Sequence, residues 1–176
     1  MRILTEPHNT SSFKEGLWVR IVISCLVIIG LGTLSGLLFT SEGEWYSNLQ
    51  KPVFTPPNWI FGPAWILLYI LMSASFALIW QVKVKTRYPI IRRYAKRGLI
   101  IFGVHFFLNL LWTPLFFGLE LPLLALINII LLFGLILFLI RYYFRIDRVA
   151  AFLLVPYALW VLFATVLNFA IVVMNG

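Results

Sequence analysis

Aromatic and hydrogen-bonding side chains recur at helical spacing inside three strongly apolar segments of the chain. The stripe within residues 99–118 has two polar and two aromatic members at positions i, i+4, i+7 and i+11: His105, Asn109, Trp112 and Phe116. Shorter stripes lie in two other segments: Trp65 with Tyr69, and Tyr157, Trp160 and Ala164. Such residues share one helix face, and flat rings beside a few amides suit a large, planar, apolar ligand. Helix–helix packing is the alternative that spacing alone leaves open.

Groups typical of acid–base, nucleophilic or metal chemistry are sparse in the sequence. No Asp or Glu lies deep in an apolar segment, Glu120 falls at a turn, and no nucleophile–base pair, phosphate-binding glycine loop or zinc motif occurs. His105 could ligate a metal or haem iron, but no second His, Cys or carboxylate lies at the spacing of a metal site. This favours a hydrogen-bonded packing role for His105. The single cysteine, Cys25, cannot form an internal disulfide. The sequence therefore predicts no metal site and no firm catalytic residue.

The composition defines the broad class of protein. The 176 residues are 62% hydrophobic and 11% charged, whereas soluble domains are about half apolar and a quarter charged. With a mean hydropathy of +0.98, the chain has too little polar surface to cover a water-soluble core. This indicates an integral protein of the lipid bilayer and excludes a soluble enzyme, a disordered protein and a disulfide scaffold. The net charge of +8 does not indicate nucleic-acid binding, because the basic residues flank apolar runs.

Five apolar runs are long enough to cross a membrane: residues 17–39, 59–80, 99–118, 121–140 and 150–174. A helix of about 20 residues spans a hydrocarbon layer of ~30 Å. The apolar residues run continuously and do not alternate, so the spans are helices and not barrel strands. The sequence predicts an all-α integral membrane protein, a five-transmembrane-helix bundle. Residues 17–175 form its single domain, after a polar tail at 1–16.

The distribution of charge predicts the orientation of these spans. Of the 14 Lys and Arg residues, Lys51 alone falls on the side that holds residues 40–58. The others lie within residues 2–20, 83–97 and 141–148. Cytoplasmic segments are enriched in Lys and Arg. We therefore expect the N-terminus on the cytoplasmic side, and the 40–58 loop and the C-terminus on the opposite side.

The loop at residues 40–58 is rich in proline and aromatic residues. Proline fixes φ and restricts the residue before it, which a flexible connector does not require. A proline-rich helix entry explains only part of this pattern. We expect a stiff lid over the outer end of the bundle, formed with these residues: Trp45, Lys51, Pro52, Phe54, Pro56 and Pro57.

Four motifs in this order carry a family resemblance. They are W-Y-x-x-L-x-K-P-x-F-x-P-P at 45–57, F-G-P-x-W-x-x-L-Y at 61–69, N-x-x-W-x-P-x-F-F at 109–117 and P-Y-x-x-W-x-x-F-A-T-x-L-N at 156–168. Together they resemble the translocator protein family, also called the TspO or peripheral-type benzodiazepine receptor family of tryptophan-rich sensory proteins. The resemblance covers about residues 17–175.

The resemblance implies a five-helix bundle, often a homodimer, with a ligand pocket beneath the first long loop. It implies porphyrin ligands such as protoporphyrin IX and haem, and isoquinoline- or benzodiazepine-type compounds, with no obligatory cofactor. Gly32 and Gly36 have the spacing for close helix approach, which supports a homodimer weakly and is explained as well by packing within the bundle.

Matched motif by motif, the resemblance also implies a ligand-binding set. Its members are Tyr46, Trp65, Tyr69, Asn109, Trp112, Thr113, Phe116, Asn128, Trp160 and Ala164. Asn128 stands where relatives often have an acid, which argues against acid-dependent chemistry. Residues 164–168 are not followed by the Tyr and Arg of the mammalian sterol motif, which argues against specific cholesterol recognition at that place.

Three functions are open at this point. The first is a membrane receptor or carrier for porphyrins and similar planar ligands, linked to tetrapyrrole handling or stress regulation. The second is a light- and oxygen-dependent porphyrin-degrading enzyme, in which the resemblance implicates Trp65 and Trp160. The third is a sterol- or lipid-binding membrane protein, or one that acts through protein partners.

Overall fold

A computed structural model of the chain describes residues 16–39 and 44–176. The described helices are α2 (Leu17–Leu38), α3 (Glu44–Asn48), α4 (Asn58–Lys85), α5 (Pro89–Thr113), the π-helical turn η1 (Pro114–Gly118), α6 (Pro122–Tyr143), α7 (Arg148–Leu153) and α8 (Val155–Asn175). Most of the polar tail expected at 1–16, and residues 40–43 of the expected lid, lie outside the described residues.

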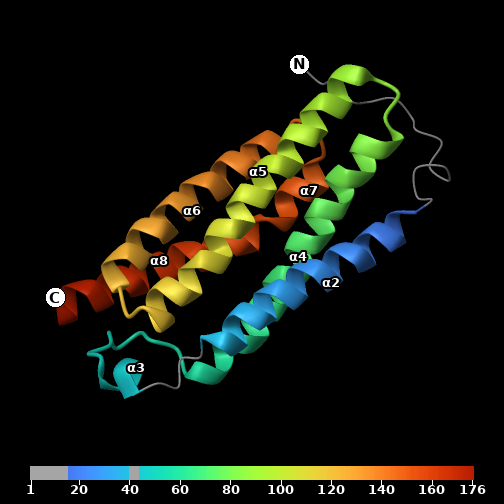
Figure 1. The fold of residues 1–176 in the computed structure, drawn as a ribbon. Helices are drawn as coiled ribbons and strands as arrows, with labels where there is room; N and C mark the ends of the chain where they lie inside the picture. The colour runs from blue at the N-terminus through green and yellow to red at the C-terminus, as the bar shows by residue number, and fades with distance from the viewer. Residues whose placement is uncertain (1–15, 40–43) are drawn as a thin grey trace.

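The prediction of an all-helical membrane bundle is confirmed. Five helical stretches are long and apolar enough to cross a bilayer, the shortest of 22 residues and the longest of 30. Figure 1 shows them running side by side along one common direction, with α2 against α4 at one edge and α6 and α8 at the other. The short helix α3 lies at the end of the bundle where α8 ends (Figure 1). The chain is therefore a multi-pass integral membrane protein.

Helices α4 and α5 continue well beyond the apolar runs that predicted them. The predicted runs end at residue 80 and resume at residue 99, whereas α4 ends at Lys85 and α5 begins at Pro89. Lys and Arg are good helix formers, and Pro89 suits the first turn because it lacks the N–H that has no partner there. Hydropathy therefore predicted the parts of α4 and α5 that fit within the hydrocarbon layer. The end of α4 and the start of α5 depend instead on local residues such as Pro89.

The last apolar run is divided into α7 and α8. The Asp147 side chain caps α7 by accepting a hydrogen bond from the Ala150 backbone N–H at 2.9 Å. The break falls at Leu154, and Pro156 stands in the first turn of α8. Proline has no N–H for the preceding turn, which accounts for the interruption at this position.

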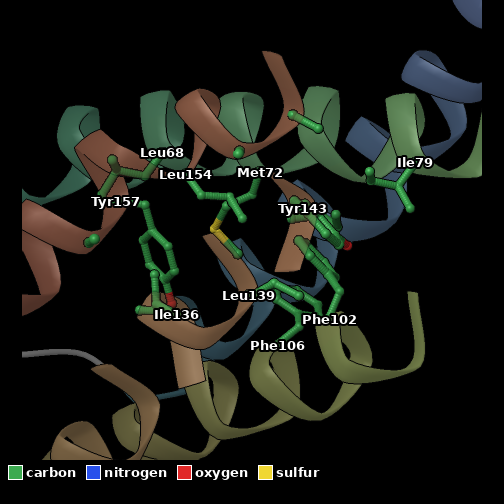
Figure 2. Close-up of a cluster of buried hydrophobic side chains, with 14 of the residues drawn as sticks. Leu68, Met72, Ile79, Phe102, Phe106, Ile136, Leu139, Tyr143, Leu154 and Tyr157 are labelled. Atoms are coloured by element: carbon green, nitrogen blue, oxygen red, sulfur yellow. The ribbon is translucent and has the colours of Figure 1, made fainter. Parts of the chain in front are cut away.

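The core is formed where α4, α5, α6 and the α7–α8 break converge. Figure 2 shows its buried side chains, which include Leu68, Met72, Ile79, Phe102, Phe106, Ile136, Leu139, Tyr143, Leu154 and Tyr157. Between transmembrane helices the driving force is close packing, since lipid is as apolar as the side chains. Fully buried alanines at 95, 150 and 151 let the helix backbones approach one another.

Helix α2 is the peripheral helix of the bundle. It packs mainly against α4, with fewer contacts to α5, and its buried residues are Ser24, Ile28 and Gly32. Two further contacts join it to the α5 side. The Ser35 hydroxyl donates to the Leu110 carbonyl at 3.3 Å, and the Phe39 ring lies directly against Gly118.

Gly32 provides the first test of this packing. A methyl group at Gly32 would overlap the Tyr69 ring, whereas one at Gly30 would meet no atom within 4 Å. Overpacking costs about 1–3 kcal/mol, and replacing glycine by alanine in a helix contributes up to about 1 kcal/mol. We expect Gly32→Ala to lower the thermal midpoint in detergent, measured by circular dichroism, and Gly30→Ala to leave it equal or higher. Equal midpoints for both variants would contradict the close contact.

Candidate functional site

A cavity of about 600 Å³ lies between the helices at the end of the bundle that α3 covers. Side chains from α2, α4, α5, η1, α6 and α8 line it, together with Tyr46 of α3. This volume falls in the range of about 300–1,000 Å³ that is typical of small-molecule sites. The cavity is therefore large enough for a ligand with several fused or linked rings.

Aromatic rings from α4, α5, η1 and α8 line this cavity. The rings of Trp65 and Tyr69, one turn apart on α4, are tilted at 32° with centroids 5.4 Å apart. Trp112 and Phe116 are stacked at 5.0 Å. Trp160 enters from α8, with the Phe61 ring edge-on to it at 6.0 Å. Rings from three sides thus present faces or edges against which a planar ligand can stack.

A chain of hydrogen bonds runs from the cavity wall into the core. The Tyr69 hydroxyl donates to Asn109 Oδ1 at 3.4 Å, and Asn109 Nδ2 donates to the Tyr157 oxygen at 3.0 Å. The Tyr157 oxygen lies 3.1 Å from His105 Nε2, and His105 Nδ1 lies 3.3 Å from the Phe102 carbonyl. Both ring nitrogens of His105 have partners, as expected for a hydrogen-bonded packing role.

A second amide holds Trp112 in position. Trp112 Nε1 donates to Asn168 Oδ1 at 3.2 Å, and Asn168 Nδ2 donates to the Pro122 carbonyl at 3.0 Å. The Pro122 carbonyl belongs to the first turn of α6, so this amide ties α5, α6 and α8 together beside the cavity. A buried polar group without a partner costs about 1–3 kcal/mol, and the arrangement satisfies all three groups.

The described part of the lid rests on the aromatic end of the bundle. Trp45 contacts the Phe116 ring edge-on at 5.6 Å, and Tyr46 packs against the Phe117 ring at 5.3 Å. The Lys51 ammonium lies 4.0 Å from the centroid of the Tyr46 ring, a cation–π contact. Burial raises the pKa of the Tyr46 phenol above its ordinary value, so this ring stays neutral beside the ammonium at physiological pH.

The proline-rich part of the lid continues this cover towards α4. The Phe54 ring meets Phe163 of α8 at 6.4 Å. A turn closes on Pro52, whose carbonyl accepts from the backbone N–H and the hydroxyl of Thr55. Pro56 and Pro57 follow, and the Pro57 carbonyl accepts from the Ile60 N–H in the first turn of α4. These prolines therefore set the direction in which the chain enters α4.

The residues expected to bind ligand gather around this one cavity, apart from Asn128. The lining includes Tyr46, Trp65, Tyr69, Asn109, Trp112, Thr113, Phe116, Trp160 and Ala164. Asn128 is buried elsewhere, where its amide donates to the Leu108 carbonyl at 3.0 Å and joins α6 to α5. In this structure it is a helix-joining residue, because its donor group is already used by the backbone of the neighbouring helix.

Sequence reasoning did not identify α2 as a wall of the cavity. The residues of this wall are Gly32, Thr33, Gly36, Leu37 and Phe39. The spacing of Gly32 and Gly36 could have indicated this wall. From the sequence, these two glycines fitted a dimer contact and packing within the bundle equally well. Gly32 packs on Tyr69, whereas Gly36 lines the cavity and has no atom within 4 Å of an added methyl group. The homodimer stays a prediction.

The fold and the cavity together define a multi-pass helical membrane protein that encloses an aromatic-walled site. Residues 22–174 match the TspO/MBR family, and the chain belongs to this family. It is 38% identical to the tryptophan-rich protein TspO of Archaeoglobus fulgidus over 166 residues, 90% of this chain and 98% of that protein. It is 32% identical to the translocator protein of Homo sapiens over 146 residues, 80% of this chain and 82% of that protein.

A clasp between the lid and the end of α8 can be tested directly. Asn175 Oδ1 accepts from the Gln50 N–H, and Asn175 Nδ2 donates to the Gln50 carbonyl, both at 2.9 Å. Each such bond contributes about 1 kcal/mol. We expect Asn175→Ala to speed backbone hydrogen exchange across residues 44–57 roughly tenfold, while Asn48→Ala, at an exposed asparagine on α3, leaves it unchanged. Equal exchange in both variants would show that the clasp does not hold the lid.

Proposed function

We propose that the chain is a membrane receptor or carrier that binds porphyrins, such as protoporphyrin IX and haem, and similar planar apolar ligands in this cavity. The observation that carries the proposal is the position of Trp65 and Trp160, on α4 and α8, in the wall of one cavity of about 600 Å³. Stacked aromatic pairs contribute about 0.5–1.5 kcal/mol beyond the area that they bury. A conjugated macrocycle, or a smaller isoquinoline-type ligand, offers the flat faces that such rings need.

The polar groups of the site support a ligand with a charged or polar edge. Lys51 is the only Lys or Arg of the described lid residues, 44–57. It is outside the cavity lining, but its ammonium lies over the Tyr46 ring, which lines the cavity. A carboxylate on the ligand, such as a porphyrin propionate, would pair with this cation. His105 is fully buried, has partners on both ring nitrogens and is absent from the cavity lining. The site therefore favours stacking over ligation of a bound iron.

Binding by stacking predicts a specific response to tryptophan variants. Protoporphyrin IX titrated into the purified protein in detergent, followed by its own absorbance, should bind the Trp65→Ala, Trp160→Ala double variant about tenfold or more weakly, because two stacking faces are lost. Trp→Phe at both sites should restore part of the affinity. Trp18→Ala is the matched control, since Trp18 is 77% exposed and outside the cavity. Unchanged affinity in the double variant would show that protoporphyrin IX does not bind between Trp65 and Trp160.

We also propose that the lid and the C-terminus face away from the cytoplasm. Support comes from the basic residues at both ends of the short Thr86–Tyr88 connection and around the α6–α7 connection, which are at the end of the bundle opposite α3. In a Cys25→Ser background in a bacterial host, an impermeant maleimide should label Val53→Cys in intact cells and Arg93→Cys only after permeabilisation. Labelling of Arg93→Cys in intact cells, with Val53→Cys labelled only after permeabilisation, would show that the orientation is the opposite of the one proposed.

A further inference from the structure

Tyr157 connects the cavity wall with a base that is fully buried. Its own side chain is 0% exposed, and so is that of His105. The Tyr157 ring lies edge-on to Trp65 with centroids 6.3 Å apart, and Trp65 lines the cavity. The phenol oxygen lies 3.1 Å from His105 Nε2. The oxidisable Trp65 ring in the cavity wall thus contacts the Tyr157 phenol, which in turn has a nitrogen partner in His105.

The hydrogen bonds fix the direction in which the phenol proton points. A carbonyl only accepts, so His105 Nδ1, which faces the Phe102 carbonyl at 3.3 Å, carries the imidazole proton. Nε2 therefore holds a lone pair, and the Tyr157 hydroxyl donates to it. Asn109 Nδ2 donates to the same phenol oxygen at 3.0 Å. Tyr157 is arranged to transfer its proton to a base while its oxygen keeps a hydrogen-bond donor.

We propose that Tyr157 and His105 form a proton-coupled redox site that receives an oxidising equivalent from Trp65. The proposal rests on the proposed function, because the oxidant is a conjugated planar ligand in the cavity, excited by light. The excited ligand takes one electron from Trp65 and passes it to dioxygen, which becomes superoxide. Trp65 then takes one electron from Tyr157, and the phenol proton moves to His105 Nε2. The products are neutral Trp65, a neutral tyrosyl radical and an imidazolium.

The transfer leaves the number of charges in the protein unchanged. Creating a new charge in a dry core is costly. Here one positive charge is present before the transfer, on oxidised Trp65, and one after it, on the imidazole of His105. The Phe102 carbonyl accepts from Nδ1 and stabilises the imidazolium, since hydrogen bonds to charged groups are the stronger ones. The charge thus moves inward to a site that already has a partner for it.

Two other buried tyrosines show why the assignment falls on Tyr157. The Tyr69 ring is nearer to Trp65, at 5.4 Å, but its hydroxyl donates to the Asn109 amide oxygen, which does not hold a proton at neutral pH. Tyr143 is also fully buried, and its hydroxyl donates to the Gly98 carbonyl at 3.2 Å. Only Tyr157 combines a described contact to a cavity tryptophan with an imidazole acceptor.

Time-resolved absorption and electron paramagnetic resonance test the proposal in protein reconstituted in lipid nanodiscs, with protoporphyrin IX in air under pulsed illumination. The wild type should form a tryptophan radical that decays into a neutral tyrosyl radical, and this step should slow in D₂O. Tyr157→Phe should abolish the tyrosyl signal and prolong the tryptophan radical. His105→Gln keeps a hydrogen-bond partner but no base, so the tyrosyl yield should fall about tenfold or more, the scale of positioned proton acceptors.

Tyr143→Phe is the matched control and should leave both radicals unchanged. A tyrosyl signal that persists in Tyr157→Phe, or a wild type that forms only tryptophan radicals with ligand bound, would overturn the proposal. If His105→Gln fails to fold, judged by circular dichroism, the proposal is still tested by the D₂O effect in the wild type and by the radicals formed in Tyr157→Phe.

A parallel arm separates this inference from the proposed function. Porphyrin affinity is measured by titration in the same nanodiscs. If protoporphyrin IX does not bind, the proposed function fails, and a flavin photosensitiser then replaces it as the oxidant. A tyrosyl radical that depends on Tyr157 and His105 under the flavin supports the redox pair by itself, and its absence overturns the pair.

Discussion

A polar group inside a hydrocarbon layer can be stabilised only by a partner within the protein, because lipid offers none. Helices satisfy the backbone in this way, and the buried amides obey the same constraint by bonding across helix boundaries. Asn128 joins α6 to α5, Asn168 joins α8 to α5 and α6, and Asn109 joins α5 to α8. These bonds fix the helices at defined heights relative to one another, and the aromatic walls of the cavity depend on that alignment.

The five spans were predictable because a bilayer imposes one length on every helix that crosses it. Hydropathy could not predict where the helices end. Lys and Arg have nearly the same helix propensity as Leu, so α4 and α5 continue through basic residues beyond their apolar runs. The ends depend on local chemistry, such as Pro89 at the start of α5. The helix α3 within the lid was also missed, because its five residues carry no periodic signal.

The lining of the candidate site could be predicted where spacing and motifs agreed. Trp65 and Asn109 belong to stripes on separate helices, and the structure brings both to one cavity. Asn128 shows the limit, since sequence position does not reveal whether an amide bonds to a neighbouring backbone or faces a void. The link from Tyr157 to His105 was equally hidden, because residues in two separate spans meet only through tertiary packing.

The position of α2 has a consequence for the route that a lipid-dissolved molecule would take. One face of α2 borders the cavity through Gly32, Thr33 and Gly36, and the other exposes side chains such as Leu31 and Leu34. A helix with its side chains is about 10–12 Å across. At a glycine there is no side chain, so only the helix backbone lies between the lipid and the cavity. Among the residues that the structure describes, α2 is the single layer between the acyl chains and the cavity on this side, and Ser35 and Phe39 tie it to the α5 side.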